Sequence, residues 1–337
     1  MGVIKTDVEK PLSSDQIKNN VNYLKRKLGK DTSPLYQRLY SDVNEISVHS
    51  LTYKDPLASQ VISDTSTLIQ RLPGHLKKAF MKPTRLMKPP LMPRIKDLCR
   101  EFVSNTSSHN YSNRSPEKLI HDGTWKESEK EITCVVKEIF GVLEDIWNNP
   151  ALDFEVSKSL NEGTYQSTVI VPAIRAVLRN LPFRTSSFIT TSEKQSIASA
   201  DRKGNGQMGR RPDIMLAMRY LDVTFELMYV ECSRLICSPQ KKIDDEIKLW
   251  RETNDGLYWT RKTLNPDKDQ FGIVGVQIAG DTLHLNVLVR DKVNIHRYYH
   301  IQSATIPVRI SDEDVVTNTS ERQREDSTTV STPLYDI

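Results

Sequence analysis

Two acidic residues in apolar segments are the first candidates for chemistry in this chain of 337 residues. Asp213 follows Pro212 and opens the run Ile-Met-Leu-Ala-Met, whereas Glu231 closes the later run Phe-Glu-Leu-Met-Tyr-Val. A buried carboxylate is costly unless it is paired, hydrogen-bonded or bound to a cation. Two such acids on neighbouring strands therefore predict a metal site.

The spacing of the two apolar runs predicts how the acids meet. The runs indicate strands over 214–220 and 225–232 with a short connection. Residues two apart share one face of a strand, so Glu231 and Ser233 project together at the end of the second strand. A hairpin would pair the strands antiparallel and bring the start of the first beside the end of the second. We therefore expect the carboxylates of Asp213 and Glu231 to meet at one edge of a sheet.

Two convergent carboxylates suit Mg²⁺ or Mn²⁺, which prefer oxygen ligands and retain water. Such an ion polarises a phosphodiester and lowers the pKa of a bound water. A structural alternative also fits the residues. Asp213 would turn the chain after Pro212, as Pro-Asp dipeptides often do, and Glu231 would pair with an arginine such as Arg234. On the two acids alone, this alternative is the simpler interpretation.

Hydrophobic periodicity predicts the elements that position these residues. We expect helices over about 127–146, 162–178 and 239–264, and strands over 271–278, 283–290 and 295–310. Pro172 inside the second helix predicts a kink or a late helix start. Residues 190–211 are polar and glycine-bearing, and are expected to form a mobile loop. The elements follow the order helix, strand, strand, helix, strand, strand. This order predicts a mixed α/β architecture with one sheet.

The placement of the acids on these elements resembles the PD-(D/E)XK nuclease superfamily, over roughly residues 155–310. Glu162 before a helix, Asp213 after proline and Glu231 at the end of the next strand match the family's acidic positions. The chain looks especially like fungal members with Gly-Arg-Arg-Pro-Asp, a Glu-x-Ser motif and a Lys-Leu helix. Here these are Gly209 to Asp213, Glu231 to Ser233, and Lys248-Leu249. The resemblance implies a restriction-endonuclease-like core (an α-β-β-β-α-β mixed sheet), and Mg²⁺ or Mn²⁺ held by Glu162, Asp213 and Glu231.

Ser233 departs from the family pattern, because the family has a lysine there that positions or activates the attacking water. Serine carries no charge, so a lysine would have to reach the site from the following helix, where Lys241, Lys242 and Lys248 lie. Lys241 and Lys248 share a face, away from the apolar stripe of Ile243, Ile247 and Trp250, and Lys248 is preferred because it lies mid-helix. The alternatives are a solvated lysine paired with Asp244 or Glu252, and loss of activity. The candidate catalytic residues are Asp213, Glu231, Ser233 and Lys248.

A basic cluster just before Asp213 is the candidate nucleic-acid-binding surface. Arg202, Lys203, Arg210 and Arg211 could hold phosphates there, or could belong to a solvated loop. Arg290, Lys292, His296 and Arg297 suggest a second basic patch. The net charge is only +4, which gives no strong nucleic-acid signal, and no sequence-reading module is visible. DNA and RNA therefore both remain open as partners.

The composition predicts a water-soluble chain in three parts. Residues 1–115 are expected to be an irregular region with short helices and a linker, 116–310 the nuclease-like α/β domain, and 311–337 a disordered tail. The four cysteines lack the spacing of a zinc site. No secretory signal or membrane-spanning run is visible, which favours an intracellular location, nuclear or cytoplasmic, without a membrane partner.

Together these features predict a metal-dependent nuclease that hydrolyses phosphodiester bonds of DNA or RNA. The first alternative is a catalytically inactive nuclease-like domain that binds nucleic acid or a protein. The second is a purely structural domain with no ligand. The missing lysine at Ser233 and the weak net charge both favour the inactive alternative.

Overall fold

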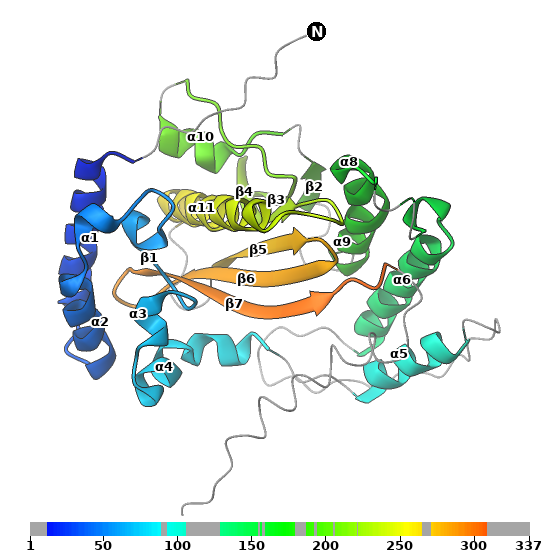
Figure 1. The fold of residues 1–337 in the computed structure, drawn as a ribbon, viewed down its shortest axis with the longest axis horizontal. Coiled ribbons are helices and arrows are strands. Elements are labelled where there is room, and N and C mark those ends of the chain that lie inside the picture. Colours follow the sequence, from blue (N-terminus) through cyan, green and yellow to red (C-terminus); the bar gives the residue numbers. More distant parts are fainter. Residues whose placement is uncertain are drawn as a thin grey trace, which may run out of the picture.

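A single seven-stranded mixed sheet, in the order β1-β7-β6-β5-β4-β3-β2, runs through the computed structural model (Figure 1). The structure describes residues 12–88, 93–105, 129–153, 156, 159–178, 187–191, 194–204, 206–220, 222–264 and 271–308. The predicted tail and most of the predicted linker lie outside these ranges. The predicted α/β class with one sheet is confirmed.

The central strands form the hairpin that the sequence predicts. β3 and β4 pair antiparallel, β4 and β5 pair parallel across a helical crossover, and β5, β6 and β7 form an antiparallel meander. β2 adds to the β3 edge and β1 pairs parallel with β7 at the other edge. The strands are β1 Val61–Ser63, β2 Ser187–Thr191, β3 Ile214–Tyr220, β4 Val223–Cys232, β5 Gly272–Ala279, β6 Thr282–Arg290 and β7 His296–Thr305. β1 and β2 were not predicted.

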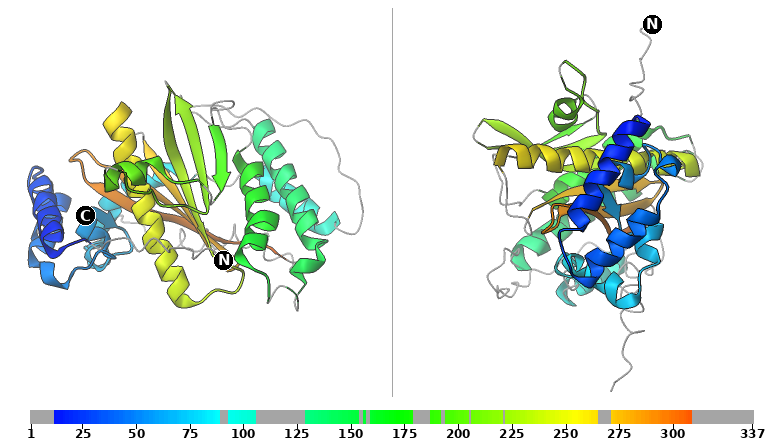
Figure 2. Two further views of the ribbon diagram at one scale, coloured as in Figure 1. Left: turned by 90° about the horizontal axis from the view of Figure 1, so that it is seen from above. Right: turned by 90° about the vertical axis from the view of Figure 1, so that its left-hand side faces the viewer.

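Helices cover both faces of the sheet (Figure 2). Along β4, alternate residues face opposite layers, as the pleat of a strand requires. Tyr229 packs in one cluster with Leu249 and Trp250 of α11 (Pro239–Leu264). Val230 and Cys232 pack on the other side in a cluster shared with α6 (Glu129–Trp147) and α9 (Val171–Leu178). None of the helices in the described ranges is long and apolar enough to cross a membrane.

The helix leading into α9 is irregular next to the proline, where the sequence predicts a kink. α8 (Glu162–Tyr165) continues into a π-helical turn, η5 (Gln166–Ile170), before α9 begins. Pro172 has no backbone N–H to donate to the preceding turn, and a wider turn at that point accommodates the missing bond.

The N-terminal helices are packed against the sheet. α1, α2, α3 and α4 gather at the β1 and β7 end (Figure 1), and α5 stacks Phe102 on Phe140 of α6 with ring centroids 4.1 Å apart. The N-terminal apolar cluster includes Tyr299 and Ile301 of β7. The described residues on either side of residue 115 thus share one sheet, through β1 and β7, and the N-terminal apolar cluster. The elements are α1 Ser14–Leu28, α2 Pro34–Glu45, η1 Val48–Ser50, η2 Pro56–Ser59, α3 Thr67–Gln70, α4 Gly74–Phe80, η3 Lys82–Leu86, α5 Pro93–Asn105 and η4 Pro150–Leu152.

A buried ion pair joins these helices to β7. The Arg297 guanidinium donates to Asp291 Oδ2 at 2.9 Å and to the Tyr36 hydroxyl of α2 at 2.6 Å. The Tyr299 hydroxyl donates to the Phe80 carbonyl at the end of α4 at 2.9 Å. Arg297 and Asp291 are both buried, so the predicted second basic patch does not form a charged surface at this residue.

The described part of 190–211 is anchored, which corrects the expectation of a mobile loop. It contains α10 (Ile197–Lys203), whose first turn binds the buried carboxylate of Glu226 on β4. The Ser196 hydroxyl and the Ile197 N–H each donate to Glu226 at 2.6 Å. Gly209 approaches the backbone so closely that a Cβ there would collide with the Ser196 carbonyl oxygen. The glycine of the Gly-Arg-Arg-Pro-Asp motif therefore allows the backbone at Gly209 to pack closely against the backbone at Ser196.

Candidate active site

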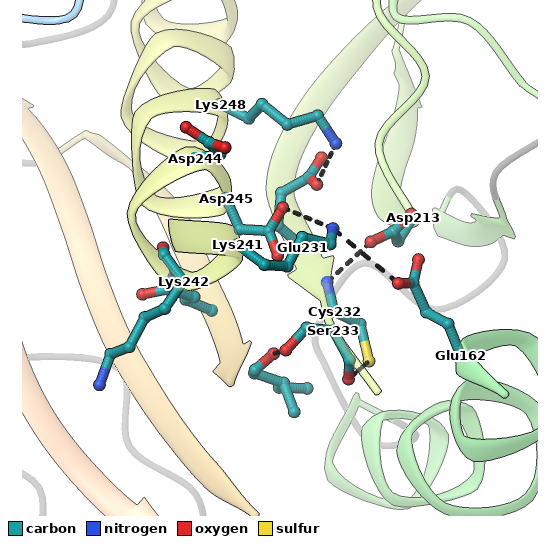
Figure 3. A network of polar contacts seen from close by, with 12 residues as sticks. Glu162, Asp213, Glu231, Cys232, Ser233, Lys241, Lys242, Asp244, Asp245 and Lys248 are labelled. Carbon is teal, nitrogen blue, oxygen red and sulfur yellow. Dashed lines mark hydrogen bonds and ion pairs between the residues drawn. The ribbon is translucent and has the colours of Figure 1, made fainter. Parts of the chain in front are cut away.

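Asp213 and Glu231 lie side by side where β3 begins and β4 ends, as the sequence predicts (Figure 3). Ile214 pairs with Val230, so one residue further along the antiparallel register Asp213 stands opposite Glu231. Asp213 Oδ2 accepts a hydrogen bond of 2.7 Å from the Cys232 N–H. Burial raises the pKa of Asp213, against the opposing effects of that hydrogen bond and of Lys248. The chain bends at Asp213, and the same residue stands opposite Glu231.

Lys248 brings a charged group to Glu231. Its ammonium group donates to Glu231 Oε2 at 2.5 Å, from the middle of α11. Glu231 is 0% exposed, and its second oxygen, Oε1, is buried without a hydrogen-bond partner. Glu231 therefore pairs with Lys248. The alternative pairs, Glu231 with Arg234 and Lys248 with Asp244 or Glu252, are not found among the described residues.

Electrostatics hold Lys248 in its charged form. Burial acts to lower the pKa of Lys248, but Glu231 and Glu252 outweigh it and the pKa is raised. Burial raises the pKa of Glu231, with Lys248 opposing the shift and Asp213 adding to it. A buried carboxylate beside a second one releases its proton reluctantly, and the nearby cation only partly compensates.

Glu162 approaches the same site from α8. Lys241 Nζ lies 2.7 Å from Asp245 Oδ1 and 3.9 Å from Glu162 Oε2, and so connects the two helices (Figure 3). The side chain of Glu162 is 41% exposed. Burial raises the pKa of Glu162, and Asp213 contributes in the same direction against Lys241. Four of the five residues predicted at this site, Glu162, Asp213, Glu231 and Lys248, thus face a common space (Figure 3).

The donor set fits a hard divalent cation held by few protein ligands. Glu231 Oε1 and Asp245 Oδ2 are buried carboxylate oxygens without hydrogen-bond partners. Within the described residues, no group of three or more His, Cys, Asp and Glu side chains is arranged to hold a metal ion. Mg²⁺ commonly binds through one or two carboxylates and completes its shell with water and substrate phosphates. Asp213 and Glu231 fit that mode, with Glu162 at the exposed side.

Glu252 is a member of this cluster that sequence reasoning did not single out as a site residue. It is buried one turn after Lys248, and both of its carboxylate oxygens lack hydrogen-bond partners. Burial and the neighbouring Glu231 raise the pKa of Glu252 well above its usual value. The predicted apolar stripe was misleading here, because Ile243 is 50% exposed. The i, i+4 spacing of Lys248 and Glu252 was the feature of the sequence from which the position of Glu252 beside Lys248 could have been predicted.

Ser233, predicted as a catalytic residue, uses its polar atoms inside the fold. Its hydroxyl donates to the Ile278 carbonyl of β5 at 3.1 Å, and its N–H donates to the same oxygen at 2.8 Å. The side chain is buried. Ser233 therefore continues the pairing between β4 and β5 beyond the last ladder residue.

The predicted nucleic-acid-binding residues are engaged with the protein to different extents. Arg202 and Arg210 bind the buried carboxylate of Asp255 on α11, at 2.5 Å and 3.0 Å. Lys203 donates to the Met208 carbonyl at 2.9 Å, and Arg211 is exposed. Arg202 and Arg210 thus hold the α10 segment on α11, and Arg211 is exposed.

Comparisons with known proteins add no relative. No protein-family model, no curated protein and no solved structure matches this chain.

Proposed function

We propose that this protein is a metal-dependent nuclease that hydrolyses phosphodiester bonds of DNA or RNA. Two observations together carry the proposal. Asp213 and Glu231 stand opposite each other where β3 begins and β4 ends, and Lys248 is hydrogen-bonded to Glu231. The order α9, β2, β3, β4, α11, β5, with α10 inserted between β2 and β3, supports a restriction-endonuclease-like core. Asp213 and Glu231, assisted by Glu162, would hold Mg²⁺ or Mn²⁺.

Each residue has a defined part in this proposal. A bound divalent cation would polarise the phosphodiester and lower the pKa of an attacking water. Glu231 orients Lys248 through their hydrogen bond. Lys248 has a raised pKa and stays protonated, so it acts as a fixed positive charge beside the reacting phosphate and does not accept the proton of the water.

The test is cleavage of supercoiled plasmid and of a labelled single-stranded RNA, each with Mg²⁺ or Mn²⁺. Asp213→Ala, Glu231→Ala and Lys248→Met are expected to reduce cleavage to background. Asp244→Asn is the matched control, because Asp244 is an exposed acid on the same helix and its side chain accepts a hydrogen bond from Gln240. Equal cleavage by the wild type and all variants would show that a contaminating nuclease cuts the substrate, and would overturn the proposal.

A second function, nucleic-acid binding without cleavage, is favoured by two observations. Ser233 is committed to β5, and Arg211 is exposed close to Asp213 in the sequence. A mobility-shift titration at several salt concentrations distinguishes the two functions. Salt-dependent binding that weakens in Arg211→Ala, with no cleavage in either metal, would support the binding module over the enzyme.

A further inference from the structure

A β-bulge on the other side of α11 brings a second set of reactive side chains together. Leu285 pairs with Gln302 and Asn286 with His300, which leaves Ile301 as an extra residue in β7. Ile301 turns into the N-terminal core. In a regular strand, residues three apart point to opposite faces, but the extra residue restores His300 and Ser303 to one face.

The sheet register shows which face this is. Glu231 stands opposite Gln277, Gln277 opposite His284, and His284 opposite Ser303, so all four project from the side that α11 covers. Gln277 donates to the Lys242 carbonyl, so α11 lies across this row. In Figure 3 the Lys242 side chain extends on the side of α11 away from Glu231. The β6 and β7 cluster is therefore separate from the Asp213 and Glu231 site.

Hydrogen bonds link His284, Ser303, His300 and Asn286 in a chain, in that order. His284 Nδ1 lies 2.7 Å from Ser303 Oγ, Ser303 Oγ lies 3.0 Å from His300 Nε2, and His300 Nδ1 lies 3.2 Å from Asn286 Oδ1. The Asn286 amide nitrogen donates to the His284 carbonyl at 3.3 Å, which fixes the orientation of the amide. The Oδ1 atom of Asn286 thus faces His300 and accepts its Nδ1–H.

The hydrogen-bond partners of each imidazole nitrogen indicate which nitrogen carries the proton. His284 Nε2 is buried without a partner, so placing the proton on Nδ1 avoids burying an unpaired donor. His284 then donates to Ser303 Oγ, and the serine hydroxyl is free to donate to His300 Nε2. Burial, Lys88 and Lys242 lower the pKa of His300, and burial, Lys242 and His300 lower the pKa of His284 to about 4. Both imidazoles are neutral near pH 7, the form in which His300 can accept a proton.

We propose that Ser303 is the nucleophile of a second active site that cleaves carboxylic esters, with His300 as its general base and Asn286 as a positioning residue. Ser303 is exposed, so a substrate can reach its hydroxyl. A serine, a histidine whose Nε2 faces it and an acceptor that holds the other ring nitrogen form the constellation needed for nucleophilic acyl transfer.

The reaction balances with water as the only co-reactant. Ser303 Oγ forms a bond to the acyl carbon while its proton moves to His300 Nε2, and the carbonyl electrons shift to oxygen. Collapse of this adduct breaks the ester C–O bond, and the leaving alkoxide takes the proton from His300. Water then attacks the acyl-serine by the same steps, which releases the acid and restores Ser303. The His284 N–H, 2.7 Å from Ser303 Oγ, would hydrogen-bond the same oxygen that attacks the ester.

The experiment is labelling of the full chain by a fluorophosphonate probe without added metal, followed by intact mass and peptide mapping. Labelling forms an Oγ–P bond at Ser303, breaks the P–F bond and releases fluoride. The wild type should gain one phosphonyl group at Ser303, and Ser303→Ala none. His300→Gln should label about a hundredfold more slowly or less, as expected for loss of a general base. Hydrolysis of p-nitrophenyl acetate should fall in parallel.

Matched variants separate chemistry from folding. Ser50→Ala removes an exposed hydroxyl that donates to a backbone carbonyl, and should label like the wild type. Asn286→Asp retains an acceptor for His300 and should keep labelling, whereas Asn286→Leu should lose it. No probe on the wild type, or equal labelling of Ser303→Ala, would overturn the proposal. Because the readout needs neither metal nor nucleic acid, its failure leaves the proposed nuclease function standing.

Discussion

Two ion pairs at different ends of the sheet each contain a buried carboxylate, and the two carboxylates differ in how many hydrogen bonds they accept. Asp291 Oδ1 accepts from the N–H groups of Val293 and Ile295 at 3.0 Å and 2.9 Å, and its Oδ2 accepts from Tyr36 and Arg297. Glu231 has one oxygen on Lys248 and the other without a partner. A buried carboxylate whose oxygens are all hydrogen-bonded stabilises one structure, whereas a buried carboxylate with an unbonded oxygen retains the capacity to bind a proton or a cation.

Breaking the closed network should have the largest effect on stability. In Asp291→Ala, Arg297 keeps its buried charge and loses its carboxylate, which costs about 3–5 kcal/mol in comparable buried pairs. Urea unfolding followed by circular dichroism measures the change. A loss below about 1 kcal/mol would remove the distinction between the two networks.

Removing an unbonded acid from the open network should have the opposite sign. Glu252 is fully buried and neither of its oxygens has a hydrogen-bond partner. Glu252→Met replaces it with an apolar side chain of similar length, and should raise the free energy of unfolding by about 1–3 kcal/mol. The urea midpoint would then rise with an unchanged slope. A midpoint that falls as in Asp291→Ala would show that Glu252 is paired.

The open network also predicts a pH dependence. The folded-state pKa of Glu252 lies above the ordinary value of 4.5. Over the range between the two values the native state binds more protons than the unfolded chain, so this group's contribution to stability is lost as pH rises above about 4.5. The advantage of Glu252→Met over the wild type should therefore grow between pH 5 and pH 8, by at most about 1.4 kcal/mol per pH unit. Urea midpoints of both proteins across that range test it, and a constant difference would contradict it.

The smallest effect is expected at a surface pair in the same helical region as Tyr36. Arg38 and Asp42 pair at 2.9 Å on α2, with the Arg38 side chain 49% exposed. Arg38→Ala should lower stability by less than about 1 kcal/mol, because exposed i, i+4 pairs contribute little and are screened by salt. The same urea experiment at low and high salt measures it. A loss as large as that of Asp291→Ala would mean that exposure does not separate the two kinds of pair.

Local patterns predicted the centre of the molecule well. Alternation located β3 and β4, and the short connection implied the antiparallel register that sets Asp213 opposite Glu231. Helical spacing placed Lys248 on the side of α11 that reaches Glu231. These inferences succeeded because each depends on residues close in sequence, where backbone periodicity decides direction.

Features set by distant contacts were missed. β1 has only three residues, and it becomes a strand because it pairs with β7, more than 200 residues later in the chain. Asp255 gave no sequence signal that it would bind Arg202 and Arg210. The bulge at Ile301 interrupts the two-residue period, so alternation alone would separate His300 from Ser303.

The pairing of β1 with β7 has a consequence for the order of folding. The N-terminal helices bury their apolar faces partly on Ile295, Tyr299 and Ile301. While the chain is being synthesised, those helices emerge long before the strand that completes their core. Contacts of such high sequence separation delay closure. We therefore expect the N-terminal helices to stay incompletely packed, and open to capture by chaperones, until β7 has left the ribosome.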